Sequence, residues 1–200
     1  MNPEIGSLLN QALEALRNSN LEAAELHLKQ VLSLGPNNPD ALRFLGVVAA
    51  QRAQYENAKA YFLATIQAAP EYAVAHSNLG NVYTKLRQFD QALGAYEEAA
   101  RLDPQDAETW SNAGVVFFEL KRFEEAIALY DKALAIDPNY AEALCNKGNA
   151  LDELKRLPTG GKGVILMGLD DKEFMASAIA VGPNGATYSG AGRAGKPTEL

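Results

Sequence analysis

The sequence predicts an all-α protein, a solenoid of helix-turn-helix hairpins, followed by a short glycine-rich appendage of β type. Three interlocked series of residues recur at one constant spacing, and they comprise prolines Pro36, Pro70, Pro104 and Pro138, glycines Gly46, Gly80, Gly114 and Gly148, and alanines Ala24, Ala58, Ala92 and Ala126. Three series at one period indicate one structural unit that is copied along the chain.

The period divides the chain into an array, residues 1–156, and a tail, residues 157–200. Within the array we expect four full repeats and a half repeat, which cover about residues 5–38, 39–72, 73–106, 107–140 and 141–156. Ala12 occupies the glycine position of the first repeat, and an atypical first copy is what a terminal capping repeat predicts.

Residues 73–106 serve as the type unit. Apolar residues at spacings of three to five predict a first helix over 73–86, and this stripe comprises Val74, Leu79, Val82, Tyr83 and Leu86. Arg87 and Gln88 form the turn, and a second helix is predicted over 89–102. Asp103 and Pro104 end it, because the residue before a proline avoids the helical region.

The small residues of the unit have a steric role. Gly80 and Ala92 are expected on facing helices of one hairpin, and Phe89 and Tyr96 are the large residues that fill the space beside them. A larger side chain at a small position would separate the two backbones, at a cost of about 1–3 kcal/mol.

These residues resemble the tetratricopeptide repeat family. The resemblance covers about three quarters of the chain and is clearest in one run of motif positions, namely Trp110, Ala113, Gly114, Phe117, Ala126, Tyr130, Ala133 and Pro138. Membership of this family implies antiparallel helix pairs in a right-handed superhelix, with the first helices lining a concave groove. It also implies a protein-interaction scaffold.

The fifth copy breaks after its first helix. Leu157, Pro158 and the glycines that follow replace the expected second helix, and the tail contains 9 of the 16 glycines of the chain. A strand is expected over 164–167, and residues 174–181 and 186–189 flank an Asn184-Gly185 pair, which is typical of a β-hairpin.

The tail also resembles one blade of the C-terminal domain of topoisomerase IV or gyrase A subunits. The shared features are the run Gly161-Lys162-Gly163-Val164, residues 169–173 and Gly192-Arg193. One blade cannot close the pinwheel of that family, so we interpret the tail as a small β appendage or a fusion fragment without topoisomerase activity.

Asparagines two residues before each later glycine are the strongest candidate binding residues: Asn78, Asn112 and Asn146. We call this set the asparagine ladder. An amide has both donors and an acceptor, so it can pair with the backbone of an extended peptide. The repeat arrays of O-linked N-acetylglucosamine transferases have a similar ladder. The alternative is that these amides hold water or cap neighbouring helices.

Further groove positions follow from the same helices. Phe44 is the ladder's equivalent in the second repeat, and Asn81 and Asn149 are expected to widen the ladder. The other expected groove residues are Arg43, Val47, Ala50, Ser77, Thr84, Lys85, Ser111, Val115, Phe118, Glu119, Asp152 and Glu153. Ser77 and Ser111 stand where a clamp for a partner's terminal carboxylate would have lysine, which argues against such a clamp.

Composition narrows the function classes. The array has 14 Lys and Arg against 21 Asp and Glu, whereas the tail is neutral, so most of the array repels nucleic acid. No apolar run is long enough to cross a membrane, and no signal peptide is evident. A single cysteine, Cys145, fits a cytoplasmic location. His27 and His76 lack partners at metal-ligand spacing, so no metal or cofactor is expected.

We therefore expect a non-catalytic scaffold that binds a protein or peptide segment in the groove. Self-association is a further expectation, because the broken fifth repeat leaves Leu144, Leu151 and Leu154 partly uncovered. Two alternatives remain. One is a nucleic-acid-associated protein that acts through its tail. The other is the substrate-presenting part of a larger glycosyltransferase-type enzyme.

Overall fold

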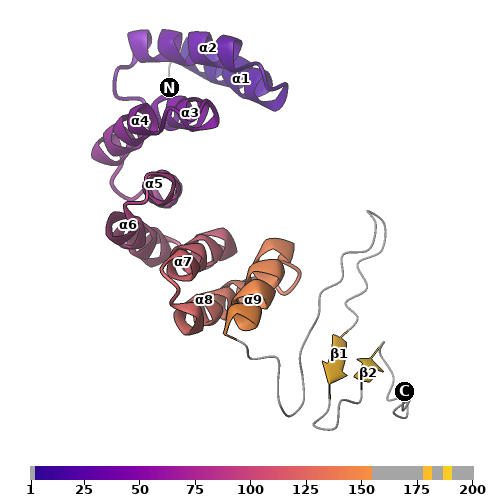
Figure 1. The fold of residues 1–200 in the computed structure, drawn as a ribbon. Helices are drawn as coiled ribbons and strands as arrows, with labels where there is room; N and C mark the ends of the chain where they lie inside the picture. The colour runs from indigo at the N-terminus through magenta and orange to yellow at the C-terminus, as the bar shows by residue number, and fades with distance from the viewer. Residues whose placement is uncertain (1–2, 155–177, 182–186, 191–200) are drawn as a thin grey trace. The chain divides into compact units, whose positions relative to one another are not determined.

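The computed structural model describes residues 3–154, 178–181 and 187–190. Within these residues the chain forms nine α-helices and one pair of β-strands (Figure 1). The helices are α1 (Pro3–Arg17), α2 (Leu21–Leu34), α3 (Pro39–Gln51), α4 (Tyr55–Ala68), α5 (Ala73–Lys85), α6 (Phe89–Leu102), α7 (Ala107–Glu119), α8 (Phe123–Ile136) and α9 (Ala141–Glu153).

The chain divides into two compact units, residues 1–113 and 114–200. In the first unit the helices pack as consecutive pairs, α1 with α2, α3 with α4 and α5 with α6. Each pair also contacts the next through α2 and α3 or through α4 and α5. In the second unit α9 packs on α8. All of these contacts join elements that are close in sequence, as a solenoid requires.

The tail contributes strands β1 (Ala178–Val181) and β2 (Thr187–Gly190). They pair antiparallel, with Ala178 opposite Gly190 and Val181 opposite Thr187. The strand expected over 164–167 and the features that resemble a topoisomerase blade lie outside the described residues. Along residues 3–154, none of the helices combines the length and the apolar character that a bilayer crossing requires.

The turns inside the hairpins repeat as regularly as the helices do. Ser19, Ala53, Arg87 and Lys121 all have positive φ, between 55° and 59°, and each follows the end of a first helix. The next residue then donates a backbone hydrogen bond five residues back, as from Gln88 to the carbonyl of Tyr83 at 2.9 Å. This satisfies a free carbonyl at the helix end. None of these four positions holds glycine, the residue that usually indicates a turn with positive φ.

The predicted stripe of the first helix is confirmed except at one residue. Leu79 and Val82 are 5% and 2% exposed, and Tyr83 and Leu86 are half-buried and pack against the core. Val74 is 47% exposed, so its assignment to the stripe was wrong. It lies in the first turn of α5.

An aromatic ring lies directly on the glycine of each hairpin. A Cβ atom built on Gly80 of α5 would lie 2.6 Å from Cε1 of Tyr96, which belongs to the second helix of the same hairpin. The same 2.6 Å separates the equivalent atoms of Gly46 and Phe62, and of Gly114 and Tyr130. Real Cβ atoms do not approach a ring so closely, so only glycine fits while the ring stays in place.

The first hairpin meets the same requirement with smaller groups. Ala12 and Leu28 stand at the glycine and ring positions, and both are fully buried. A methyl group on one helix and a branched aliphatic side chain on the other thus fill the space that a glycine and an aromatic ring fill in later hairpins.

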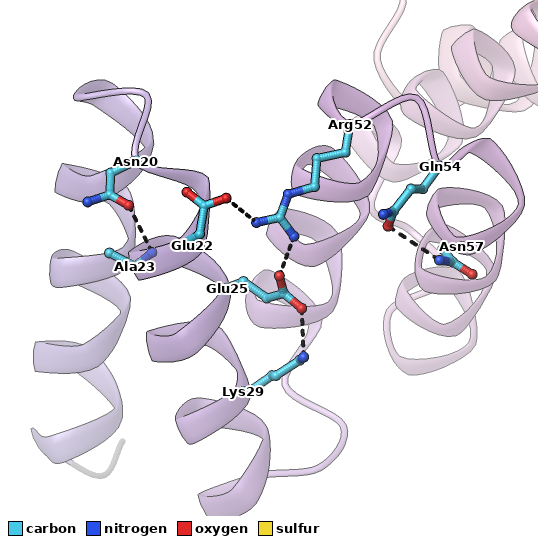
Figure 2. A network of polar contacts seen from close by, with 8 residues as sticks. All are labelled: Asn20, Glu22, Ala23, Glu25, Lys29, Arg52, Gln54 and Asn57. Carbon is cyan, nitrogen blue, oxygen red and sulfur yellow. Dashed lines mark hydrogen bonds and ion pairs between the residues drawn. The ribbon is translucent and has the colours of Figure 1, made fainter.

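A polar link joins the first two hairpins. Figure 2 shows Arg52, at the end of α3, reaching Glu22 and Glu25 on α2. Its Nη2 lies 3.1 Å from Glu22 Oε1, and Nη1 contacts Glu25. Lys29 and Arg52 hold the pKa of the Glu25 carboxyl below its ordinary value by hydrogen bonding. In the next hairpin the equivalent of Arg52 is Leu86, which packs against the core.

We expect Gly46→Ala to destabilise the protein by about 1–3 kcal/mol, because the added methyl group meets the Phe62 ring. The loss should shrink when Phe62→Leu is also present, because this pair reproduces Ala12 and Leu28. Chemical denaturation of both single variants and the double variant measures the coupling.

Gly94→Ala is the matched control, since nothing lies within 4 Å of that Cβ position. It should stabilise α6 by about 0.5–1 kcal/mol. Additive effects of Gly46→Ala and Phe62→Leu would contradict the steric account.

Replacing Arg52 with leucine tests the link between the first two hairpins. A carboxyl whose pKa is lowered on folding adds stability above its ordinary pKa, and this contribution disappears as pH falls through the lowered value. Arg52→Leu should therefore be less stable than wild type at pH 7, and the difference should fade in acid as Glu25 is protonated. Urea titrations at pH 7 and in acid measure the difference in stability between Arg52→Leu and wild type. An equal difference under the two conditions would rule out the ion pair as its cause.

Candidate functional site

The first helices α5 and α7 are joined by a buried hydrogen bond. Thr109 Oγ1 lies 2.9 Å from Ser77 Oγ and 2.5 Å from Asp106 Oδ2. Ser77 is 6% exposed and Ser111 is fully buried. Both serines were expected to line the groove, and that prediction was wrong, because neither side chain is accessible. At Ser77 the side chain contacts Thr109 of the next first helix.

The ladder residues in the first unit directly follow those two serines. Asn78 on α5 and Asn112 on α7 are both half-buried. Neither amide has a hydrogen-bond partner among the described residues, so each retains its donors and its acceptor. The Ser77–Thr109 contact places these two asparagines on neighbouring helices. In the second unit, Asn146 on α9 is half-buried, whereas Asn149 is exposed.

Asn81 differs from the other predicted asparagines, because it takes part in the packing of its own hairpin. Its Oδ1 accepts a hydrogen bond from the hydroxyl of Tyr96 at 2.6 Å. Thr84, another expected groove residue, donates to the Gly80 carbonyl at 2.9 Å. Both side chains are half-buried, so each has one side towards the hairpin and one towards its surface.

Arg43 belongs to a cluster at the junction of α3 and α5. Its Nε donates to the hydroxyl of Tyr72 at 2.9 Å, and that hydroxyl donates to Asp40 Oδ1 at 2.8 Å. The guanidinium lies 3.9 Å from the centre of the Phe44 ring, which is within range of a cation–π interaction. Burial, followed by the hydrogen bond to Asp40, raises the pKa of Tyr72. The cluster therefore orients Arg43 while the tyrosine stays protonated.

An open, mainly apolar pocket of about 620 Å³ lies beside this cluster, lined by Ala69, Pro70, Glu71 and Tyr72. Its floor is the loop between α4 and α5, and His76 Nε2 lies 2.8 Å from the carbonyl oxygen of Pro70. The same bond recurs in the next repeat, where the indole of Trp110 donates to the carbonyl of Pro104 at 3.0 Å. Both aromatic residues therefore anchor the preceding loop.

The remaining predicted groove residues divide into packed and exposed side chains. Val47 packs against the core around Phe62. In the second unit, Val115 and Phe118 pack against the core that contains Tyr130, and the rings of Phe118 and Phe123 meet edge to face with their centres 5.3 Å apart. The exposed members are Lys85, Glu119, Asp152 and Glu153. Cys145 is exposed. Within the described residues, no group of three His, Cys, Asp or Glu side chains is arranged to hold a metal ion.

Sequence comparison identifies the repeats. A family model described as tetratricopeptide repeat matches residues 9–73 and 77–141, and a second model of the same description matches residues 129–160. Together they cover well over half of the chain. Among curated proteins, none matches this chain significantly.

Solved structures show the same fold. MamA is 21% identical, with a TM-score of 0.67 over 78% of this chain and 85% of its own. Cut9, in a hetero-tetramer of the APC/C with Hcn1, is 26% identical, with a TM-score of 0.69 over 72% of this chain but only 29% of its own. The first TPR of Spaghetti (RPAP3), bound to the HSP90 peptide SRMEEVD, is 24% identical, with a TM-score of 0.57 over 58% of this chain and 93% of its own.

Two buried serines at equivalent positions allow a matched test of the contact between α5 and α7. Ser77→Ala removes the partner of Thr109 on α5, leaves its contact with Asp106 in place and should cost about 1 kcal/mol. Ser111→Ala should be neutral or slightly stabilising, because the buried Ser111 Oγ has no partner among the described residues. Thermal unfolding of both variants checks the difference. Equal losses would mean that the Ser77–Thr109 bond does not stabilise the contact.

Proposed function

The chain belongs to the tetratricopeptide repeat family, and from this premise we propose that it is a non-catalytic scaffold whose first helices bind an extended segment of a partner protein. The observation that carries the proposal is the state of the amides on α5 and α7. Asn78 and Asn112 are half-buried on neighbouring helices and have no partner among the described residues. Half-buried amides lose water without gaining a bond, unless a ligand supplies one.

A segment of protein main chain suits these amides. The backbone of an extended peptide presents one donor and one acceptor per residue, and a side-chain amide can pair with either. Such pairing does not depend on the side chains of the partner. The oriented Arg43 and the apolar pocket beside Tyr72 then supply groups that can discriminate among partner side chains. Asn146 and Asn149 offer the same chemistry on α9 of the second unit.

Relatives of similar fold support a binding role. The Spaghetti domain is held in complex with a peptide, and Cut9 is part of a hetero-tetramer. The acidic array of this chain, with 21 Asp and Glu against 14 Lys and Arg in residues 1–156, favours a neutral or basic partner segment over a nucleic acid.

The test uses a phage-displayed library of short random linear segments selected on the full chain. Replacement of Asn78, Asn112 and Asn146 with alanine should keep the helical circular dichroism signal. It should weaken binding of the selected segments about tenfold or more, because the hydrogen bonds of Asn78 and Asn112 in the first unit, or that of Asn146 in the second, are lost. Asn57→Ala, on the second helix α4, is the matched control and should bind as wild type does. Equal binding by the triple variant and wild type would refute the ladder.

A further inference from the structure

The Tyr96 side chain connects the core of the third hairpin to its first-helix surface. It starts on α6, its ring covers Gly80, and only 2% of the residue is exposed. Its hydroxyl then reaches Asn81 on α5, where the two oxygens are 2.6 Å apart. The residue that fills the space over the glycine therefore also makes a polar contact with a predicted groove residue.

The oxygen end of the Asn81 amide faces the tyrosine, and the distance between the two groups agrees with this orientation. A separation of 2.6 Å is typical of an O–H···O hydrogen bond, whereas an N–H···O bond is usually about 2.9–3.0 Å long. Thr84 Oγ1, 3.4 Å from the hydroxyl, gives its own proton to the Gly80 carbonyl. Tyr96 is thus the donor, and Asn81 Oδ1 is the acceptor.

The hydroxyl keeps its proton over the physiological range. Burial raises the pKa of Tyr96 to about 12, and the carboxylate of Glu108 adds to this, against an opposing effect of the Thr84 hydrogen bond. A protonated hydroxyl can donate, and a buried hydroxyl without an acceptor would be destabilising. The bond to Asn81 is therefore the favoured state of both groups at neutral pH.

The neighbouring repeats provide internal comparisons. Phe62, which covers Gly46, has no hydroxyl, and the residue that corresponds to Asn81 is Val47. In the second unit Tyr130 covers Gly114, and the corresponding residue is Val115. The ring is thus present in all three hairpins. The hydroxyl and the amide occur together only at Tyr96 and Asn81, so covering the glycine does not by itself require the pair.

We propose that Tyr96 is a positioning residue that holds Asn81 in one amide orientation, so that Asn81 offers only N–H donors to a bound segment and selects its main-chain carbonyl oxygen. Since Oδ1 is occupied by the tyrosine, Nδ2 is directed away from it, and this nitrogen has no partner among the described residues. Asn78 and Asn112 carry no such restraint and can present either end of the amide. This inference rests on the proposed function. It specifies that Asn81 acts as a hydrogen-bond donor to the bound segment.

The first measurement needs no ligand. In wild type, NMR should show at most a weak nuclear Overhauser effect between the Asn81 amide protons and the Tyr96 ring, because the amide oxygen and not the nitrogen faces the hydroxyl. Tyr96→Phe keeps the ring over Gly80 and removes only the hydroxyl, so it should shift the Asn81 side-chain signals. Tyr130→Phe is the matched control and should leave them unchanged. A strong effect between the Asn81 amide protons and the ring would overturn the orientation.

The second measurement uses the phage-displayed segments that the wild-type chain retains. Asn81→Asp still accepts from Tyr96 but replaces the donor with an oxygen, so it should weaken binding more than tenfold. Tyr96→Phe should weaken binding about three- to tenfold, since a freed amide no longer has one orientation. Both variants should unfold cooperatively, and Tyr130→Phe should bind as wild type does.

The outcomes separate this inference from the function on which it rests. Segments that depend on Asn78 and Asn112 but bind Asn81→Asp and Tyr96→Phe as well as wild type would overturn the inference and leave the scaffold role standing. Equal losses in Asn81→Asp and Asn81→Ala, with none in Tyr96→Phe, would also overturn it. A library from which no segment is retained would contradict the proposed function itself.

Discussion

The contact between an aromatic ring and a glycine is the constraint on which each later hairpin depends. In three hairpins a ring atom lies only 2.6 Å from the position that a Cβ atom on the glycine would take. The two helices can approach closely only because one of them has no side chain there. Each copy of the unit must therefore carry both residues at a fixed separation along the chain. This explains why glycine recurs in the middle of helices, where it is otherwise unfavourable.

The same contact determines where the tip of each ring emerges. At Tyr96 the far end of the ring carries a hydroxyl that donates to Asn81, the residue that follows the glycine. At the equivalent place in the second hairpin, Phe62 has no hydroxyl, and Val47 packs against the core that contains this ring. A single oxygen atom thus converts a packing contact into a polar one without altering the fit over Gly80. In this way the core can vary the chemistry of the surface while the hairpin stays the same.

The junctions between hairpins differ more than the hairpins themselves. Arg52 bridges two glutamates at the first junction, whereas Arg43, Tyr72 and Asp40 form a chain of hydrogen bonds at the second. A buried serine and threonine join α5 to α7. In a solenoid each junction contacts only its neighbours, so these groups can change independently. Hairpins of similar construction thereby acquire individual polar surfaces.

Sequence alone determined the repeat, the two helices of the type unit to within one residue and the small-to-large pairs, because residues that pack in every copy recur at a constant period. It also located Asn78 and Asn112, whose binding role stays a prediction. Only the tertiary structure showed that Ser77 and Ser111 are buried and that Val74 is exposed, since the periodicity of one helix does not say which other residues lie against each side chain. The turns with positive φ at Ser19, Ala53, Arg87 and Lys121 contain no glycine at those positions, so the local sequence did not predict them. The Tyr96–Asn81 bond likewise joins residues that are distant in sequence, and only the fit of a ring over a glycine brings them together.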